Sequence, residues 1–116
     1  MNKNHPQGNM FANIPQELPD ELFETLVSNQ QLRIERIVSR QHVTAEGDWY
    51  DQAWDEWVLV LQGCAEIAYQ HQQATIVLDK GDYLLIPAQT VHRVLSTSAY
   101  EDTVWLAVHF GKNQSL

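Results

Sequence analysis

The sequence predicts an all-β protein of antiparallel strands in a single domain. Its 116 residues are enough for one ordinary domain with one hydrophobic core. After residue 30, about seven short apolar runs follow one another, separated by turn residues at the spacing typical of a β-sandwich or barrel. No segment in this region has a helical period, so the crossover helices that parallel strands require are missing.

The first residues differ from the rest of the chain. Residues 1–16 are rich in Asn, Gln and Pro, which predicts a loose or edge-lying tail ahead of one domain over 17–116. A short helix is expected at about 19–28, because Pro19 suits a first helical turn and acidic residues follow it. Leu22 and Leu26 would form its apolar stripe.

The strands are predicted from apolar, β-branched runs that end at glycine, proline or polar turns. Gly63, the Gly81–Asp82 turn and Pro87 are the clearest breaks. The expected strands cover 32–39, 57–62, 65–69, 74–78, 83–86, 91–95 and 103–110.

Charge and composition exclude several classes of partner. The formal net charge is -8, from 7 basic and 15 acidic residues, which argues against nucleic acid and anionic membrane surfaces as partners.

Cys64 is the single cysteine, so no disulfide can form within the chain. No apolar stretch is long enough for a membrane span and the first residues are polar, so a cytoplasmic protein is expected.

Two segments carry a recognisable spacing. In the first, six residues separate Glu56 from Gly63; in the second, five separate Gly81 from Pro87 and four separate Pro87 from His92. These segments resemble the paired motifs of the cupin superfamily, and the resemblance covers about residues 30–110. The sequence of these segments is similar to that of small bacterial cupins of undefined function that are called phosphomannose-isomerase-like. The resemblance implies a cupin-type jelly-roll barrel with its pocket around Glu56 and His92.

The resemblance also implies that His92 and Glu56 are ligands of a divalent metal such as Fe, Mn, Ni or Zn, with no organic cofactor. Imidazole nitrogen and carboxylate oxygen are suitable donors for these ions. The His-x-His pair of the first motif is missing, however. Its two positions fall on Tyr50 and Gln52, or on Trp49 and Asp51.

The remaining ligands are therefore open. Gln52 or Asp51 would supply oxygen in place of the missing imidazoles. His109, and less readily His42, would restore a site of two histidines and one carboxylate if it points inward. An oxygen-rich site and a site without metal both remain alternatives.

A ligand pocket is expected beside these residues. Tyr50, Trp49 and Trp54 would form either a pocket wall or an apolar lid. Arg36 and Arg93 would hold an anionic ligand through paired hydrogen bonds, unless they face solvent as strand arginines commonly do.

Three functional hypotheses follow. The first is a metal-dependent cupin that binds a small sugar or carboxylate and acts as an isomerase or oxygenase. The second is a metal-free binding or sensing module. The third is a metal-free acid/base enzyme of the epimerase type, using His92 and Tyr50. A small-molecule ligand and a homodimer are expected in each case.

Overall fold

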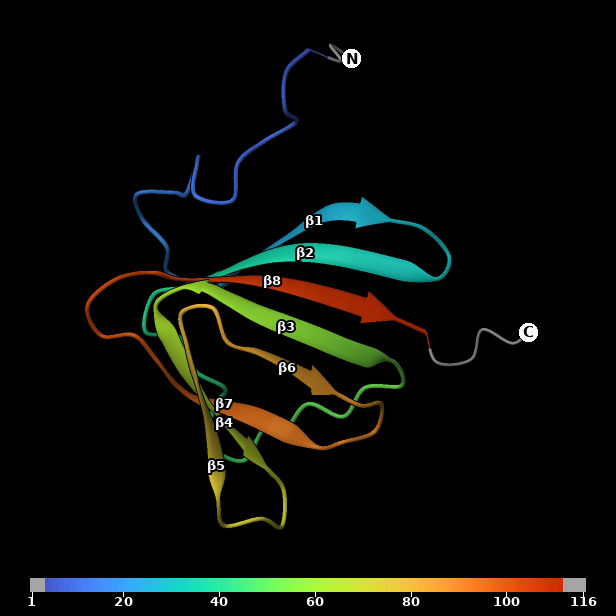
Figure 1. The fold of residues 1–116 in the computed structure, drawn as a ribbon. Helices are drawn as coiled ribbons and strands as arrows, with labels where there is room; N and C mark the ends of the chain where they lie inside the picture. The colour runs from blue at the N-terminus through green and yellow to red at the C-terminus, as the bar shows by residue number, and fades with distance from the viewer. Residues whose placement is uncertain (1–3, 112–116) are drawn as a thin grey trace.

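The computed structural model describes residues 4–111, which form eight strands in two facing sheets (Figure 1). The larger sheet has the order β1-β2-β8-β3-β6 and the smaller one the order β5-β4-β7, with every pairing antiparallel. No pairing between the two sheets closes a barrel within these residues. The strands are β1 (Leu22–Ser28), β2 (Leu32–Ser39), β3 (Asp55–Gln62), β4 (Cys64–Tyr69), β5 (Thr75–Asp79), β6 (Tyr83–Ile86), β7 (His92–Thr97) and β8 (Thr103–Phe110).

The all-β antiparallel architecture is confirmed, and the seven strands expected after residue 30 are present. Their bounds shift by at most two residues, because strand ends depend on the partner strand. The core lies between the sheets, where alternate residues of each strand point inward. It consists of Ile37, Val58, Val60, Ala65, Ile67, Leu78, Trp105 and Ala107.

The helix predicted over 19–28 is wrong, and no helix occurs in residues 4–111. Leu22–Ser28 instead forms β1, which pairs antiparallel with β2 from Leu22 opposite Val38 to Ser28 opposite Arg33. Asn29 closes this hairpin: its side-chain oxygen accepts a 2.8 Å hydrogen bond from the backbone N–H of Gln31. The open edge of β2 provides backbone partners for the whole segment, which outweighs a weak helical preference.

An N-terminal arm (residues 4–20) precedes β1 and is attached to the larger sheet by the side chains of β2 and of the loop after it. Arg36, almost fully buried, donates from Nη1 to the carbonyl oxygens of Met10 and Ala12 at 3.2 and 2.6 Å. Its Nε donates to Glu24 on β1 at 2.8 Å. The arm therefore covers the face of this sheet that points away from the core.

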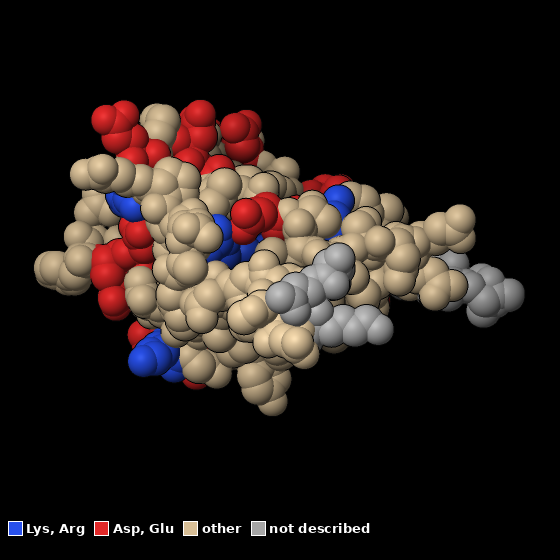
Figure 2. All heavy atoms as spheres, turned by 90° about the horizontal axis from the view of Figure 1, so that it is seen from above, with Lys and Arg blue, Asp and Glu red and all other residues tan. Residues whose placement is uncertain are grey.

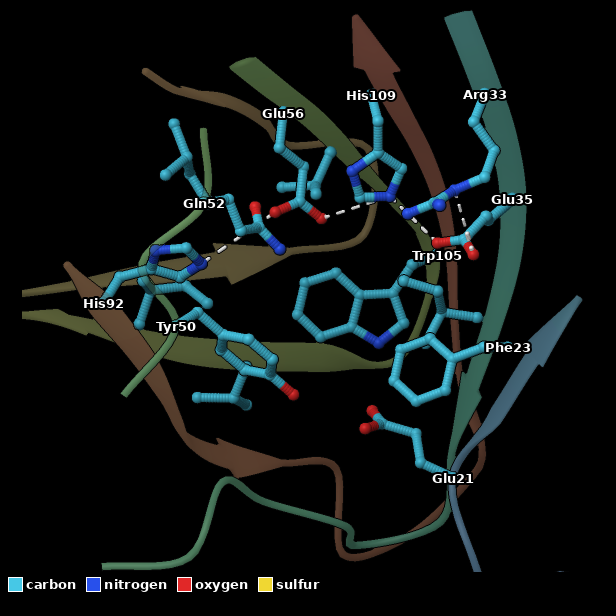
Figure 3. Close-up of a pocket in the computed structure, with 15 residues that line it drawn as sticks. Glu21, Phe23, Arg33, Glu35, Tyr50, Gln52, Glu56, His92, Trp105 and His109 are labelled. Carbon is cyan, nitrogen blue, oxygen red and sulfur yellow. Dashed lines mark hydrogen bonds and ion pairs between the residues drawn. The ribbon is translucent and has the colours of Figure 1, made fainter. Parts of the chain in front are cut away.

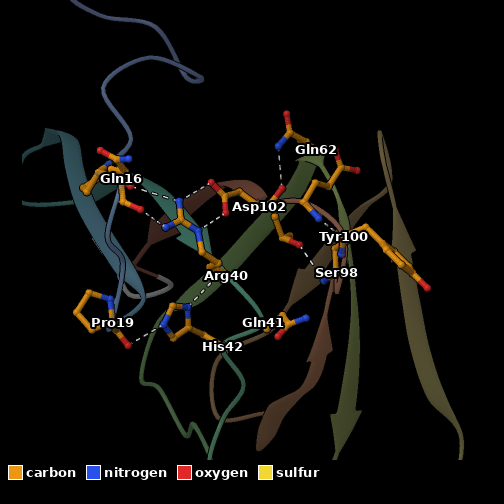
Figure 4. A network of polar contacts seen from close by, with 12 residues as sticks. Gln16, Pro19, Arg40, Gln41, His42, Gln62, Ser98, Tyr100 and Asp102 are labelled. Carbon is orange, nitrogen blue, oxygen red and sulfur yellow. Dashed lines mark hydrogen bonds and ion pairs between the residues drawn. The ribbon is translucent and has the colours of Figure 1, made fainter.

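A second set of contacts anchors the end of the arm (Figure 4). The guanidinium of Arg40 donates to both carboxylate oxygens of Asp102 at 2.7 and 2.9 Å and also reaches the arm. His42 accepts from the backbone N–H of Arg40 through Nδ1, so its Nε2 donates to the arm. The acceptors in the arm are the carbonyl oxygens of Pro15, Gln16 and Pro19.

Among the residues that the structure describes, none belongs to a helix capable of crossing a membrane.

Candidate functional site

A cavity of about 170 Å³ lies between the two sheets, against the inner face of β2, β8 and β3 (Figure 3). Apolar side chains from both sheets form its floor, and Glu21 and Phe23 stand where β1 begins. Polar side chains gather at the other end of the cavity: Arg33, Glu35, Gln52, Glu56, His92 and His109.

Strand register explains why charged groups from distant parts of the sequence meet here. Glu56 on β3 lies opposite His109 on β8, and His109 lies opposite Arg33 on β2. Cross-strand partners share one face of a sheet, so these three side chains form a row on the inner face. Glu35, two residues beyond Arg33, adds a carboxylate to the same face.

The hydrogen bonds of His109 determine where its proton lies. The indole N–H of Trp54, which is only a donor, lies 2.9 Å from Nδ1 of His109, so Nδ1 carries the lone pair. Nε2 then carries the proton and donates to Oε1 of Glu35 at 2.9 Å. Burial lowers the pKa of His109 despite the opposing effect of Glu35, which keeps the ring neutral. Both of its nitrogens are therefore engaged.

His92 carries its proton on the opposite nitrogen. Nδ1 lies 2.9 Å from the carbonyl oxygen of Thr90 and donates to it, which leaves the lone pair on Nε2. That lone pair faces Oε1 of Glu56 at 3.9 Å, too far for a hydrogen bond. Burial lowers the pKa of His92, and Tyr50 stacks on its ring at 5.4 Å. A neutral acceptor nitrogen thus points into the cavity.

Glu56 is the most perturbed carboxyl group of the cavity. The residue is 8% exposed, and burial raises its pKa from 4.5 to about 7. The negative charge of Glu35 contributes to this increase, and the positive charge of Arg33 opposes it. Near pH 7 this carboxyl group therefore exists both as an acid that donates a proton and as a carboxylate that accepts one.

Tyr50 is held beside His92 by the backbone. The two residues exchange both main-chain hydrogen bonds, at 2.8 and 3.1 Å, in an isolated antiparallel bridge. Burial, followed by the charge of Glu21, raises the pKa of the Tyr50 hydroxyl, so it stays protonated at neutral pH.

Half of the residues predicted from the sequence line this cavity. Of the predicted metal ligands, His92, Glu56, Gln52 and His109 line it, whereas Asp51 is exposed and does not. Of the predicted pocket residues, only Tyr50 lines it.

The other four pocket predictions are placed elsewhere. Arg36 points to the opposite face of the larger sheet, where it holds the N-terminal arm. The guanidinium of Arg93 lies over the ring of Trp49, 5.5 Å from its centroid, outside the cavity. Trp54 contacts the cavity only indirectly, through its hydrogen bond to His109. His42, the alternative inward histidine, is bound to the arm.

The cavity residues that were missed include three charged ones, Arg33, Glu35 and Glu21, and the aromatic residues Phe23 and Trp105. Arg33 and Glu35 were missed because charged residues in a strand normally face solvent. Glu21 and Phe23 were missed because they belong to the segment predicted to be a helix. Only the pairing of β2 with β8, which the sequence does not contain, places Arg33 opposite His109.

The donor set does not fit a divalent metal ion as it is arranged. His92 offers one imidazole lone pair, and Glu56 and Gln52 offer oxygens. His109 offers none, because metal binding at Nε2 would move its proton to Nδ1, which faces the Trp54 N–H. Across residues 4–111, no group of three or more His, Cys, Asp or Glu side chains is placed to hold a metal.

Comparisons with known proteins bear on the family. No protein-family model matches the chain, and no curated protein matches it. A solved structure from Ralstonia eutropha JMP134, named a putative mannose-6-phosphate isomerase, matches with a TM-score of 0.87 and 44% identity, covering 92% of this chain and 99% of that chain.

Two more distant structures share the fold. A cupin superfamily protein from Desulfitobacterium hafniense DCB-2 has a TM-score of 0.69 at 20% identity, covering 85% of this chain and 84% of that chain. A cupin-2 domain protein from Shewanella frigidimarina NCIMB 400 has a TM-score of 0.60 at 19% identity, covering 77% of this chain and 79% of that chain. The fold is thus that of cupins, and the Ralstonia protein is a relative over almost its whole length. The chain therefore belongs to the cupin superfamily, in one family with the Ralstonia protein.

Proposed function

We propose that this cupin binds a small polar molecule between its sheets without a metal ion and exchanges protons with it through Glu56 and His92. The observation that carries the proposal is that a proton donor and a proton acceptor face each other in the cavity. A carboxyl group with a pKa of about 7 faces a neutral imidazole lone pair at 3.9 Å. A general acid or base acts best when its pKa lies near the working pH.

Each group has a defined part in such an exchange. Protonated Glu56 would donate to a ligand oxygen or nitrogen, and ionised Glu56 would take a proton back. The lone pair of His92 Nε2 would accept a second proton, while the Thr90 carbonyl holds the ring in place. A ligand atom that lies to one side of the two groups would be within hydrogen-bond reach of both.

The name of the Ralstonia relative suggests mannose 6-phosphate as a substrate. The cavity does not favour it. A phosphate dianion would meet the carboxyl groups of Glu21, Glu35 and Glu56, while Arg33 already faces Glu35 at 3.5 Å. The volume of about 170 Å³ is close to that of a ~150 Å³ cavity that holds benzene, so much of a sugar phosphate would lie outside it.

Metal content provides the first test. Untagged protein would be incubated with Mn, Fe, Ni and Zn in turn, dialysed, and measured by elemental analysis beside the variants His92→Ala and His5→Ala. His5 is exposed in the N-terminal arm and serves as the matched control. We expect no stoichiometric metal in any of the three proteins. One metal per chain in the wild type and His5→Ala, lost in His92→Ala, would overturn the metal-free proposal.

Proton exchange requires Glu56 to titrate near neutral pH, which is the second test. Carbon-13 NMR of the glutamate carboxyl carbons should show one resonance that titrates near pH 7 and disappears in Glu56→Gln. If all glutamate carboxyl groups titrate near their ordinary pKa, the proposed acid–base role fails.

A further inference from the structure

We infer that the cavity selects a small organic cation, an ammonium compound with a short polar tail. This inference rests on the proposed function only in that the cavity is a ligand site. It follows from the charges of the lining, its aromatic rings and its volume, all of which agree on one chemical class.

The balance of charge in the lining is negative. Three carboxyl groups line the cavity against one guanidinium, and both histidine rings are neutral in their hydrogen-bonded arrangement. The charge of Arg33 is partly balanced by Glu35, whose Oε2 lies 3.5 Å from Nε, and Cζ of Arg33 lies 5.8 Å from the ring centroid of Trp54. The remaining carboxyl groups, Glu21 and Glu56, have no cationic partner within salt-bridge distance among Lys and Arg of the described residues. A cationic ligand would supply the missing charge.

Glu21 is held in position rather than free to turn toward solvent. Its Oε2 accepts a short hydrogen bond from the hydroxyl of Ser39, which is fully buried. The same hydroxyl accepts from the indole N–H of Trp105 at 3.1 Å. The carboxyl group is therefore fixed below the rings at the start of β1, where Figure 3 shows it beneath Phe23.

Three aromatic rings line the same space. Phe23, Tyr50 and Trp105 stand between the carboxyl group of Glu21 and that of Glu56 (Figure 3). The faces of aromatic rings carry negative electrostatic potential and attract cations, most strongly where the ring is buried. Trp105 is buried, whereas Phe23 and Tyr50 are 52% and 37% exposed. Groups of aromatic rings recognise quaternary ammonium ligands in proteins.

The volume restricts the ligand further. Because a ~150 Å³ cavity holds benzene, about 170 Å³ holds roughly seven non-hydrogen atoms, and a longer ligand would extend past the exposed ring of Phe23 into solvent. Trimethylammonium with a two-carbon alcohol tail has this size. With its ammonium group beside Glu21, its hydroxyl group would point toward Glu56, whose carboxyl group offers an acceptor oxygen in either protonation state.

The charge of the whole molecule favours the same class. The net charge is -8, and Figure 2 shows a group of acidic side chains at the upper left of the face that it draws, with acidic and basic side chains mixed over the rest. A negative protein attracts cations and raises their local concentration. Long-range and local electrostatics thus act in the same direction.

The test compares three probes of similar size and different charge: choline, its neutral carbon isostere 3,3-dimethylbutan-1-ol, and the anion 3,3-dimethylbutanoate. Binding to the full chain is measured by calorimetry at 0.15 M salt, with thermal shift in support. We expect choline to bind at least tenfold more tightly than the neutral isostere, and the anion not to bind. Equal or tighter binding of the neutral isostere or the anion, or no binding of choline, overturns the inference.

Variants of the lining residues test whether the preference for the cationic probe arises in the cavity. Glu21→Gln should reduce choline affinity at least tenfold and leave the neutral isostere unchanged. The matched control Glu101→Gln, which removes the same charge from an exposed position, should change neither. If Glu21→Gln fails to fold by circular dichroism, Phe23→Leu takes its place with the same expectation. An equal loss in the control, or none in either cavity variant, refutes the inference.

The outcomes separate this inference from the proposed function. If the Glu56 carbon titrates near pH 7 and choline does not bind, the cation selectivity fails and the acid–base pair stands. If choline binds as expected and Glu56 titrates normally, the acid–base role fails and the cation site stands.

Discussion

Replacing Glu56 by glutamine is expected to stabilise the protein above pH 7 and to have much less effect at pH 4. Folding raises the pKa of this carboxyl group from 4.5 to about 7, chiefly by burial. Below pH 4.5 the group is protonated in the folded and the unfolded chain, so folding does not change its ionisation. As pH rises toward 7, the unfolded chain loses this proton first, and the folded state is progressively destabilised.

The magnitude follows from the same two pKa values. At ~1.4 kcal/mol per pKa unit, the difference between 4.5 and about 7 corresponds to about 3 kcal/mol at pH 8. A glutamine side chain has nearly the same shape and no charge, so Glu56→Gln should remove this pH-dependent penalty. The free energy of unfolding of the variant minus that of the wild type should therefore increase by about 3 kcal/mol between pH 4 and pH 8.

Urea unfolding followed by tryptophan fluorescence at half-unit pH intervals measures this difference. The pH dependence matters rather than the offset, because a constant effect of the amide group cancels between pH values. The control Glu101→Gln neutralises an exposed carboxyl group and should show a difference that is nearly independent of pH. Glu35→Gln removes the second cause of the raised pKa of Glu56, the charge of Glu35. It should therefore narrow the pH range over which the protein loses stability.

A difference between Glu56→Gln and the wild type that stays within about 0.5 kcal/mol from pH 4 to pH 8 would refute the reasoning. It would mean that the carboxyl group is solvated in the folded state. A difference that grows toward low pH would mean that a positive charge stabilises the ionised form.

Three further predictions concern the site and its framework. Trp54→Phe removes the N–H donor to His109, so about 1 kcal/mol of stability is lost and the second ring tautomer appears in nitrogen-15 NMR of the imidazole. Ile67→Ala leaves a void at a 1% exposed core position, which should cost about 2–5 kcal/mol in urea unfolding. Gly63→Ala should unfold much of the protein at 37 °C by circular dichroism, because Gly63 has φ +84 and a Cβ there would lie 2.5 Å from Oγ1 of Thr103.

Each of these changes has a matched control. Trp49→Phe should leave the His109 tautomer as it is, and a mixture of tautomers there would argue against the assigned hydrogen bond. Val77→Ala, at a 58% exposed position, should change stability by less than about 0.5 kcal/mol. Gly47→Ala shares a positive φ but meets no atom within 4 Å, so it should cost only about 1 kcal/mol; an equal cost at both glycines would contradict the steric argument.

Most of the fold could be predicted from the sequence, because strand alternation and turn residues are local signals. Gly63, the Gly81–Asp82 turn and Pro87 mark the ends of strands that the structure contains. The prediction for the segment around Leu22 was wrong because its apolar residues suit a helix locally, and only pairing with the open edge of β2 makes it a strand. That edge is a tertiary feature, which a local pattern does not contain.

The site could be predicted where a motif fixes it and not where pairing does. Glu56 and His92 lie at motif positions and line the cavity. Arg33 and Glu35 were missed because charges on a strand normally face water, and only their pairing with β8 brings them beside His109. Arg36, by contrast, alternates with these residues and so points to the other face.

The attachment of the N-terminal arm places a constraint on how this chain can vary in evolution or by design. Arg36, Arg40 and His42 all bind main-chain carbonyl oxygens of the arm rather than its side chains. Every residue type carries such a carbonyl, so substitutions along the arm leave these bonds in place. An insertion or deletion between the anchored carbonyls would displace them from their donors. The arm should therefore tolerate changes of sequence far better than changes of length.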